Sequence, residues 1–336
     1  MPSSDRQSIL GLWARLLAFS APLLAGWLLL EWGMGRVPTS HSVKRDRLAA
    51  LAGEVETVIL GSSEAYYGIV PKRLTGSAFS LANSSQSLYY DDALIEHLLP
   101  RLPRLRRVIV PISYFTLYFQ LYDHEESWRQ YQYAQVWGLP LQRPADRLSL
   151  RRFSRVALYT PRVAIQELFH RFRMSLAPQV DDRGWYHVPE AEHWGLGPAE
   201  ARGRLAVHES FMHEAYFGPN AAVLRRLLTT LRGRGVDVVF VTTPVWPTYQ
   251  AGMRPELWNR ARSTVEQLAR EYGALYLSFL HEPRMRAEDF LDCDHLNAQG
   301  ALRFTAILDA SLRARDEAAA RPTAEAAAAH AGELAP

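Results

Sequence analysis

Two short stretches, far apart in the chain, hold the residue types of a nucleophilic site. The first is VETVILGSSEAYYGI, residues 55–69, whose apolar run is long enough for a buried strand and stops at Gly61-Ser62-Ser63. A serine at that point lies at the carboxyl edge of a sheet, where open α/β folds bind their ligands. Because a serine hydroxyl alone is a weak nucleophile, Ser63 needs a base from elsewhere in the chain.

The second stretch, FLDCDHLNAQG, supplies the candidate base. Asp292 and His295 are three residues apart on one predicted loop, so both side chains can face the serine. In such an arrangement the imidazole takes the proton of Ser63, and the carboxylate orients the imidazole and stabilises its charged form. Asp294 is a rival for the orienting role, but as the neighbour of His295 it is expected to point elsewhere.

Each of these residues also has a purely structural interpretation. Ser63 is a suitable helix N-cap before Glu-Ala-Tyr, and Asp292 or Asn297 could cap the last helix. Taken singly, capping is as good an explanation as catalysis. The order of the two stretches, with strand-Gly-x-Ser early and Asp-x-x-His late, favours the catalytic interpretation.

An acyl-transfer site also needs donors for the oxyanion. The expected donors are backbone N–H groups of Ser63 and of the loop formed by Asn83, Ser84 and Ser85. Gly61 is expected to permit a sharp turn and to leave room for a substrate beside the backbone.

The pattern of apolar runs predicts the elements that position these residues. Expected strands cover 55–60, 78–81, 107–112, 236–242 and 274–277, and expected helices cover 88–99, 220–232, 256–272 and 298–315. Strands that alternate with helices in this way predict a three-layer α/β/α sandwich with a mostly parallel sheet. The α/β domain is expected to span 55–316.

Residues 113–219 interrupt this rhythm with an insertion whose first part, Tyr114–Trp137, is rich in aromatic residues. A helix is expected over 149–173, and 177–218 is expected to be irregular. A long insertion at the carboxyl edge of a sheet can form a lid or a substrate wall. The alternative, favoured for most of its aromatic residues, is that they fill a second small core.

The two ends of the chain differ from the middle. Residues 1–34 contain the apolar stretch 9–34, which predicts a single uncleaved transmembrane helix, with an amphipathic or buried helix as the alternative. Residues 35–54 are expected to be a polar linker leading into a short helix, and the Ala-rich residues 317–336 a disordered tail. Basic residues after the apolar stretch would, by the positive-inside rule, place the main domain in the cytoplasm.

The composition and the motifs that the sequence lacks exclude several classes of function. Hydrophobic residues make up 48% of the 336 residues, enough for a substantial core, and the formal net charge is +3. No basic run resembles a recognition helix, so nucleic-acid binding is not expected. The spacing of His208 and His213 does not share a helix face, and no nucleotide-binding glycine motif is found, so neither a metal nor a cofactor is expected. Cys293 is the only cysteine, which excludes an internal disulfide, and it is expected to be a small buried residue.

The motifs resemble those of the SGNH (GDSL-like) hydrolase superfamily, whose first block is Gly-Asp-Ser and whose last is Asp-x-x-His. They are most similar to a membrane-anchored branch that includes D-alanyl transfer proteins of lipoteichoic acid synthesis and polysaccharide O-acetylation proteins. That branch shares three motifs with this chain: Gly61-Ser62-Ser63-Glu64, Ser85-Gln86-Ser87-Leu88 and Asp292-Cys293-Asp294-His295-Leu296. The chain departs from the superfamily at Ser62, which replaces the Asp of the first block. It also lacks a clear second-block glycine and the third-block Gly-x-Asn-Asp.

The resemblance implies a function as well as a flavodoxin-like fold. It implies a serine O-acyltransferase that acts on a cell-surface polysaccharide or envelope glycan through an acyl-serine, beside a polytopic membrane-bound O-acyltransferase. It also implies a periplasmic domain on the bacterial inner membrane, against the direction of the charge rule. The alternatives are a carbohydrate esterase or deacetylase, and a catalytically silent glycan-binding subunit of an acylation complex.

Overall fold

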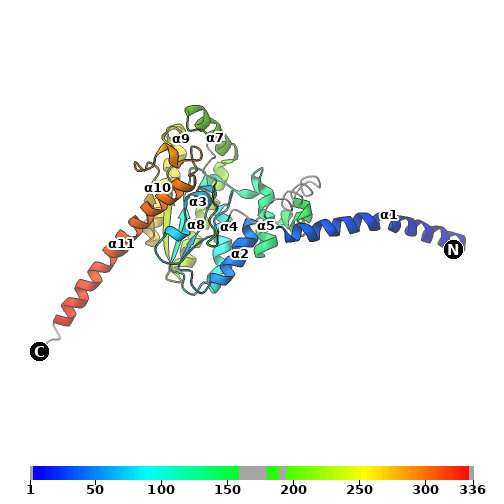
Figure 1. The fold of residues 1–336 in the computed structure, drawn as a ribbon, viewed down its shortest axis with the longest axis horizontal. Helices are drawn as coiled ribbons and strands as arrows, with labels where there is room; N and C mark the ends of the chain where they lie inside the picture. The colour runs from blue at the N-terminus through cyan, green and yellow to red at the C-terminus, as the bar shows by residue number, and fades with distance from the viewer. Residues whose placement is uncertain (1–2, 159–179, 189–193, 333–336) are drawn as a thin grey trace. The chain divides into compact units, whose positions relative to one another are not determined.

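The computed structural model describes residues 3–158, 180–188 and 194–332, and it divides the chain into two compact units (Figure 1). The first unit joins residues 1–39 to residues 130–178, and the second joins residues 40–129 to residues 179–336. The predicted insertion is therefore shared between the two units.

The second unit is built on a five-stranded parallel sheet, as the sequence predicted. The strands are β1 (Thr57–Ile59), β2 (Ala78–Ser80), β3 (Arg107–Pro111), β4 (Asp237–Thr242) and β5 (Leu275–Ser278). They lie in the order β2-β1-β3-β4-β5, and every neighbouring pair is parallel. β1 to β4 are buried along nearly their whole length, which explains why their sequences are continuous runs of apolar residues rather than alternating ones.

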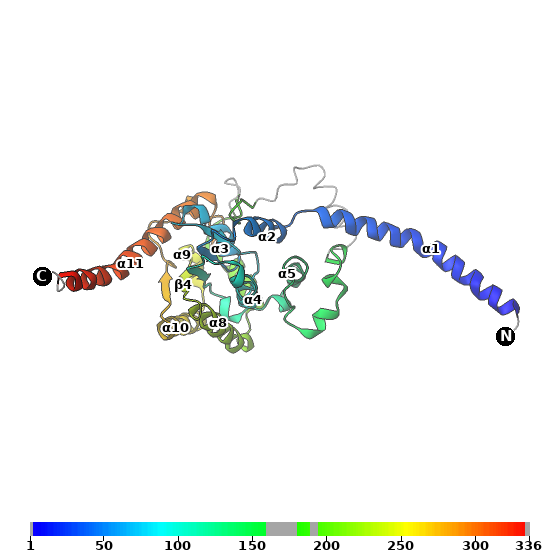
Figure 2. The same ribbon diagram turned by 90° about the horizontal axis from the view of Figure 1, so that it is seen from below.

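Helices cover both faces of this sheet and complete the predicted three layers (Figure 2). On one side, α3 (Ser63–Gly68) packs with α11 (Ala298–Gly332). On the other side, α8 (Phe217–Arg232) packs with both α4 (Leu88–Leu98) and α10 (Pro255–Tyr272). The bounds of α4, α8 and α10 agree with the predicted helices to within a few residues.

The core beneath α11 shows how the sheet and helix hold together. Ile59, Ile109 and Val239 project from three adjacent strands into one cluster with Phe304 and Leu308 of α11. All five side chains are buried, and burial of each contributes about 1.5–3 kcal/mol to stability. This cluster fixes the end of β1, and with it Ser63, against the helix that follows His295.

The strand order locates a ligand site. The connection from β1 leads to β2 on one side, whereas β3 lies on the other side of β1, so the strand order reverses between β1 and β3. Ligands of open α/β sheets bind at the carboxyl ends of the strands at such a switch point. Ser63 follows β1 and therefore lies at this point.

The first unit contains α1 (Ser3–Arg36), α5 (Gln130–Trp137) and several short 3-10 turns. The segment Ile9–Arg36 of α1 has 28 residues and a mean hydropathy of 1.6, long and apolar enough to cross a membrane by length and composition. Elsewhere in the unit, Tyr131, Leu141 and Leu158 form a small buried cluster, in which Tyr131 is the one aromatic residue.

The helix predicted over 149–173 is wrong in its first ten residues. The structure has 3-10 turns at Leu150–Arg152 and Val156–Leu158 instead, and residues 159–173 lie outside the described residues. The cause is Glu31 of α1, whose carboxylate accepts the N–H groups of Arg155 and Val156 at 2.6 and 3.2 Å. These donors are therefore satisfied without a helix.

Three other predictions differ from the structure. Residues expected to be irregular include α7 (Pro198–Phe211), which starts with proline at its first position, where proline suits a helix. The short helix expected after the linker is present as α2 (Ser40–Leu51), with Lys44 and Leu48 buried, whereas the short helix α9 (Pro247–Gly252), which follows β4, was not expected. α11 continues to Gly332 where a disordered tail was expected, because its Ala-rich sequence has a high helix propensity.

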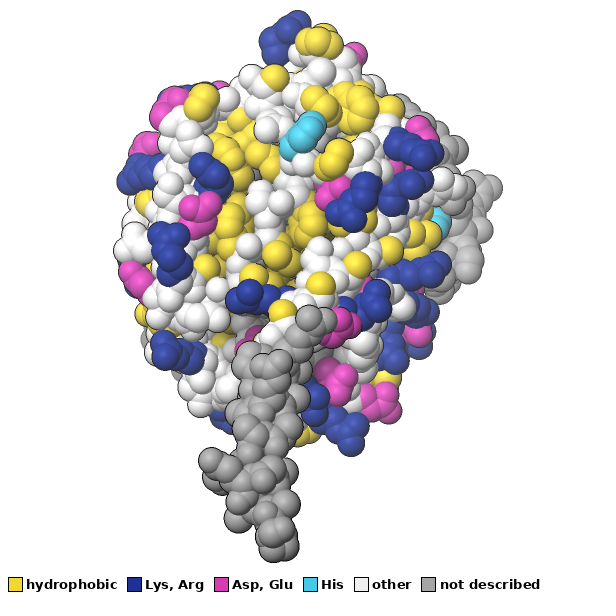
Figure 3. Space-filling model, turned by 90° about the vertical axis from the view of Figure 1, so that its left-hand side faces the viewer, with side chains coloured by type: hydrophobic (Ala, Val, Ile, Leu, Met, Phe, Trp, Pro, Cys, Tyr) yellow, Lys and Arg dark blue, Asp and Glu magenta, His cyan; other side chains and the backbone are white. Residues whose placement is uncertain are grey.

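Charges on the described surface are mixed. On the face in Figure 3, side chains of Lys and Arg lie among carboxylates and apolar areas.

Candidate active site

Ser63 is the first residue of α3, immediately beyond the edge of the sheet. Ser62 is the N-cap of this helix, although its side chain makes no capping hydrogen bond. Its carbonyl accepts the N–H groups of Ala65 and Tyr66 at 3.2 and 3.0 Å. The hydroxyl of Ser63 is directed to His295, so the capping interpretation of Ser63 is wrong.

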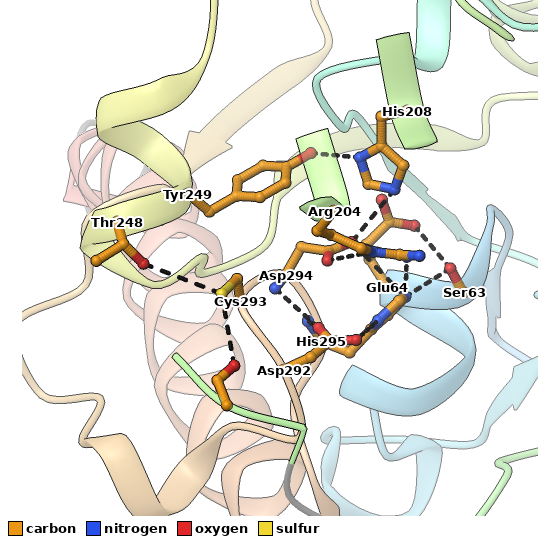
Figure 4. A network of polar contacts seen from close by, with 11 residues as sticks. Ser63, Glu64, Arg204, His208, Thr248, Tyr249, Asp292, Cys293, Asp294 and His295 are labelled. Carbon is orange, nitrogen blue, oxygen red and sulfur yellow. Dashed lines mark hydrogen bonds and ion pairs between the residues drawn. The ribbon is translucent and has the colours of Figure 1, made fainter. Parts of the chain in front are cut away.

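Ser63, His295 and Asp292 form an unbroken chain of hydrogen bonds (Figure 4). His295 Nε2 lies 2.8 Å from Ser63 Oγ, and His295 Nδ1 lies 2.8 Å from Asp292 Oδ2. The two stretches that sequence analysis paired across 232 positions therefore meet.

The loop that carries the imidazole is held by the same carboxylate. Asp292 Oδ1 accepts the backbone N–H groups of Asp294 and His295 at 2.9 and 2.8 Å. Asp292 is therefore not the cap of α11. Asn297 has that role, because its Oδ1 accepts the N–H of Gly300 at 3.0 Å.

This geometry defines the tautomer of His295. A carboxylate accepts hydrogen bonds, so Asp292 keeps the proton on Nδ1 and leaves the Nε2 lone pair towards Ser63. His295 and Asp292 are only 4% and 6% exposed. The arrangement can therefore deprotonate the serine and hold the proton during attack on an acyl carbon.

Nearby carboxylates favour the protonated imidazole. Burial acts to lower the pKa of His295, but Asp294 and then Asp292 outweigh it, so the pKa lies above its ordinary value. A base with a raised pKa accepts a serine proton more readily, at the cost of being protonated over a wider pH range.

Asp294 has different partners, as expected. Its carboxylate accepts two hydrogen bonds from Arg204, at 2.6 Å from Nε and 3.1 Å from Nη2. It lies 3.8 Å from His295 Nε2 and 3.6 Å from His208 Nε2. Although burial acts to raise the pKa of Asp294, the opposite charges of His295 and Arg204 hold it well below the ordinary value.

Arg204 is the site residue that sequence analysis missed. It comes from α7, in the insertion, and its Nη2 also donates to His295 Nε2 at 3.3 Å. Burial acts to lower the pKa of Arg204, but Asp294 outweighs it and the net direction is upward, so the guanidinium stays charged. In a chain with 38 basic residues, almost all of them arginine, no motif distinguishes this one.

Two more buried groups complete the network in Figure 4. Glu64 is buried, with Oε2 at 3.5 Å from Ser63 Oγ, and burial raises its pKa. His208 pairs through Nδ1 with the hydroxyl of Tyr249, and burial lowers its pKa to about 3, so the ring is neutral at pH 7.

The structure tests the histidines and the cysteine that sequence analysis considered. His208 is buried beside Asp294, whereas His213 is half-exposed near Asp123, so the two are not brought together. Ligand atoms of Asp292, Asp294 and His295 do lie within 4.8 Å of one another. As arranged, however, both nitrogens of His295 have protein partners and Asp294 is paired with Arg204.

Cys293 lies beside this network but is not one of its charged members. The residue is 1% exposed, as expected for a small buried residue, and burial raises the pKa of its thiol.

The four residues expected to bind substrate or oxyanion divide into two pairs. Ser84 and Ser85 line the same cavity as Ser63, and Ser85 has a φ of 57°, a strained value for a residue other than glycine. Among the described residues, the backbone N–H groups of Ser84 and Ser85 have no acceptor. Those two groups remain candidate oxyanion donors.

Gly61 and Asn83 do not reach that cavity. Gly61 has the expected positive φ of 104°, but a Cβ there would lie 2.9 Å from the ring of Pro111, so the space is filled by protein and not open to substrate. Its N–H donates to Asp91 at 2.9 Å. The Asn83 side chain accepts from Ser40 and donates to the Leu81 carbonyl.

The cavity beside Ser63 has a volume of about 280 Å³. Phe115, Phe119, Phe211 and the rim residue Trp194 give it an aromatic wall, and Glu125, Glu126 and Arg129 give it charged groups. All of these residues, Trp194 included, lie in the insertion 113–219. The insertion therefore forms one wall of the cavity, which agrees with the expectation that it builds a substrate wall.

Comparisons with known proteins give remote likenesses only. No family model matches the sequence, and no curated protein matches it. A GDSL-like lipase from Bacteroides thetaiotaomicron aligns at 10% identity and a TM-score of 0.38, over 82% of this chain and all of the other. A catalytic mutant of an acetylxylan esterase from Geobacillus stearothermophilus aligns at 11% identity and a TM-score of 0.37, over 76% of this chain and 94% of the other.

A third structure, from Streptococcus pneumoniae and provisionally named a platelet activating factor, aligns at 10% identity and a TM-score of 0.40. It covers 88% of this chain and 99% of the other.

Proposed function

We propose that this protein is a serine acyl-transferring enzyme in which Ser63 is the nucleophile, His295 the general base and Asp292 the residue that orients it. The observation that carries the proposal is the Asp292–His295–Ser63 chain, with both hydrogen bonds at 2.8 Å and its serine on the wall of a cavity. A serine used only for structure would not need a buried imidazole whose other nitrogen is fixed by a carboxylate.

The first half of the reaction acylates the enzyme. Ser63 Oγ attacks the carbonyl carbon of an ester while its proton moves to His295 Nε2. When the tetrahedral intermediate collapses, the ester C–O bond breaks and the leaving alkoxide takes that proton as an alcohol. Ser63 then carries the acyl group, and His295 is neutral again.

The second half passes the acyl group on. A hydroxyl group of the acceptor gives its proton to His295 Nε2 and attacks the acyl carbon, and Ser63 leaves with the proton returned from the imidazole. The same steps serve a glycan hydroxyl or water. Which acceptor arrives decides between transferase and esterase activity.

Negative charge on the carbonyl oxygen needs donors in both halves. Ser63, at the start of α3, lines the same cavity as Ser84 and Ser85, so the backbone N–H groups of these three residues are the proposed donors. Arg204 adds a charged donor. Once His295 Nε2 is protonated it no longer accepts from Arg204 Nη2, so this N–H becomes available to the oxyanion.

We propose a glycan as the acceptor. Aromatic faces such as Phe211 and Trp194 can stack on sugar rings, and carboxylates such as Glu125 can accept hydrogen bonds from hydroxyl groups. With α1 as a membrane anchor, and following the resemblance of the motifs, we place the enzyme on the periplasmic side of a bacterial inner membrane. There it would act on a cell-surface or envelope polysaccharide beside a polytopic O-acyltransferase.

An esterase or deacetylase is the second candidate, and one observation favours it. Ser63 is only partly buried and faces the cavity, so water can reach an acylated serine. A catalytically silent glycan-binding subunit is the third candidate, and it requires that Ser63 never be acylated.

The experiment follows the acyl group. Full-length protein in detergent is mixed with an activated acetyl ester, and intact mass and peptide mapping determine whether Ser63 gains an acetyl group. Addition of oligosaccharides then shows whether acetyl moves to sugar or is released as acetate. Acetylated sugar supports the transferase and free acetate alone supports the esterase. The absence of acetyl-Ser63, of acetylated sugar and of acetate release contradicts both.

A further inference from the structure

A short exposed segment of the first unit has the composition of a membrane-surface contact. Leu148, Leu150 and Phe153 are 89%, 62% and 69% exposed. Arg147, Arg151 and Arg152 stand between and beside them, also exposed. We call these six residues the 147–153 patch. Three large apolar side chains this exposed within six residues mark an interaction site more often than chance exposure.

The backbone of the patch is fixed, so the exposure does not come from a loose loop. Ser149 accepts the N–H of Arg151 at 3.3 Å with its side chain and the N–H of Arg152 at 3.0 Å with its carbonyl. The guanidinium of Arg152 lies 5.3 Å from the centre of the Phe153 ring. These contacts hold the apolar and basic side chains on a common turn.

The patch is joined directly to the end of α1. Ser154, the next residue, donates to Glu31 of α1 at 2.7 Å, and the N–H of Arg155 donates to the same carboxylate. The guanidinium of Arg155 donates to the carbonyls of Met34 and Gly35, at 3.2 and 3.0 Å. The residue that follows Phe153 is therefore bonded to Glu31, near the end of α1.

The length of α1 gives the depth at which Glu31 would lie in a bilayer. At 1.5 Å per residue, about 20 residues cross the roughly 30 Å of bilayer hydrocarbon. A span that starts near Leu10 would end near Leu29, which leaves Glu31 and Trp32 at the membrane–water boundary. Trp27, one turn before, and Trp32 are the residue type that anchors helices there.

From this position and composition we propose that the 147–153 patch docks on the surface of an anionic bilayer, with Leu148, Leu150 and Phe153 in the headgroup–acyl boundary and the three arginines on anionic lipid headgroups. The proposal rests on α1 crossing the membrane and is independent of the acyl-transfer proposal. Each basic residue near an anionic surface contributes about 1 kcal/mol. The contact would fix the first unit at the membrane at a second point besides α1.

The test measures the depth of single residues in full-length protein. The protein is reconstituted in vesicles of phosphatidylcholine with or without phosphatidylglycerol, with an environment-sensitive fluorophore on an introduced cysteine. Cys293 is 1% exposed and will not compete for the label. Leu150→Cys and Phe153→Cys report the patch, Phe19→Cys reports α1, and Arg270→Cys on an exposed position of α10 is the water-exposed control.

The patch labels should shift to shorter emission wavelength and lose intensity to quenchers near the top of the acyl chains. Phe19→Cys should respond to quenchers deeper in the bilayer, and Arg270→Cys should respond to neither. If the labels on the patch are quenched no more than the label on Arg270→Cys, while the label on Phe19→Cys is quenched, the proposal is overturned. An unquenched Phe19→Cys would remove its premise and overturn it too.

A separate variant tests whether the three arginines bind anionic lipid. Arg147→Gln, Arg151→Gln and Arg152→Gln together leave the apolar residues in place. In phosphatidylglycerol vesicles, the ratio of molecules with the patch bound to the membrane to molecules with the patch in water should fall about fivefold per arginine removed. A ratio unchanged by the triple substitution would contradict docking on anionic lipid.

Discussion

Around the imidazole of His295, two carboxylates only two residues apart have different partners. Asp292 holds Nδ1 at 2.8 Å, whereas Asp294 pairs with Arg204 and lies 3.8 Å from Nε2. The sequence predicted this division, because adjacent side chains on an extended loop diverge while residues three apart can converge. It did not predict Arg204, since the contact depends on where α7 packs.

The raised pKa of His295 leads to a prediction about pH. Acylation of Ser63 needs a neutral imidazole, so its rate should rise with pH around a midpoint above 6.5, the ordinary histidine value. Asp294→Asn removes the carboxylate that contributes most to the upward shift, so the midpoint should fall. Rates of Ser63 labelling by a fluorophosphonate from pH 5 to 9 measure it.

The matched control is Asp92→Asn, which removes a carboxylate paired with Arg226 on α4 and α8, away from the cavity. Its midpoint should equal that of the unmodified protein. A midpoint that Asp294→Asn leaves in place would show that Asp294 does not act on His295.

The contribution of His295 to the free energy of unfolding changes with pH in the opposite direction to the labelling rate. A histidine whose folded pKa is raised contributes stability that is present below its unfolded pKa and is lost as pH rises through the folded value. His295→Gln should therefore weaken the fall in the free energy of unfolding above pH 6.5, measured by denaturant titration at several pH values. An identical pH dependence in both proteins would contradict the raised pKa.

Arg204 gives a prediction about the oxyanion. Arg204→Gln should slow labelling of Ser63 by about 100-fold, the typical effect of losing one oxyanion donor. The single variant leaves Asp294 buried without its partner, so Arg204→Gln with Asp294→Asn is measured beside it. Arg226→Gln, which breaks a comparable pair elsewhere, should label at the normal rate. Normal labelling in the double variant would exclude a role for Arg204 as a donor.

At the scale of elements, the turn between β1 and α3 determines the position of Ser63. Apolar runs predicted the strands, and periodicity predicted α4, α8 and α10, because packing and local propensity agree in those segments. The prediction failed at 149–158, where Glu31 of α1 replaces the helical partners of two N–H groups. It also failed at α7, whose sequence has little amphipathic pattern. The Glu31–Arg155 contact joins residues 124 positions apart, which a local sequence pattern does not reveal.

The β1–α3 turn should tolerate only glycine at position 61. Alanine there would have a positive φ and a Cβ 2.9 Å from Pro111, so Gly61→Ala should lower the free energy of unfolding by about 2 kcal/mol and slow labelling of Ser63. Gly53→Ala is the control, since a Cβ at that glycine meets nothing within 4 Å. Thermal unfolding of both variants measures the difference, and equal stability would show that the turn relaxes without cost.

At the scale of the whole molecule, the basic residues after the apolar stretch and the proposed acceptor indicate opposite sides of the membrane for the second unit. The pattern of apolar residues predicted the apolar stretch of α1 and the α/β class, but the side of the membrane does not depend on any contact within the protein. Arg36, Arg45 and Arg47 follow the apolar stretch and argue for a cytoplasmic second unit, whereas the proposed acceptor is outside the cytoplasm.

Topology is tested with reporters at the C-terminus. A phosphatase that is active only in the periplasm should be active when fused after Pro336 and expressed in a bacterium, and a cytoplasm-dependent fluorescent protein at the same position should be dark. The reverse pattern would contradict the envelope glycan as acceptor. It would leave the chemistry of Ser63 untouched.

The measurement that tests the central claim most directly is covalent labelling of Ser63. Full-length protein treated with a fluorophosphonate should gain the mass of one phosphonyl group, mapped to Ser63, because the Asp292–His295 pair activates that hydroxyl. Ser63→Ala should gain nothing, and His295→Ala should react far more slowly while unfolding at a similar temperature. A protein that is folded yet unlabelled, or labelled equally well without His295, would contradict the account.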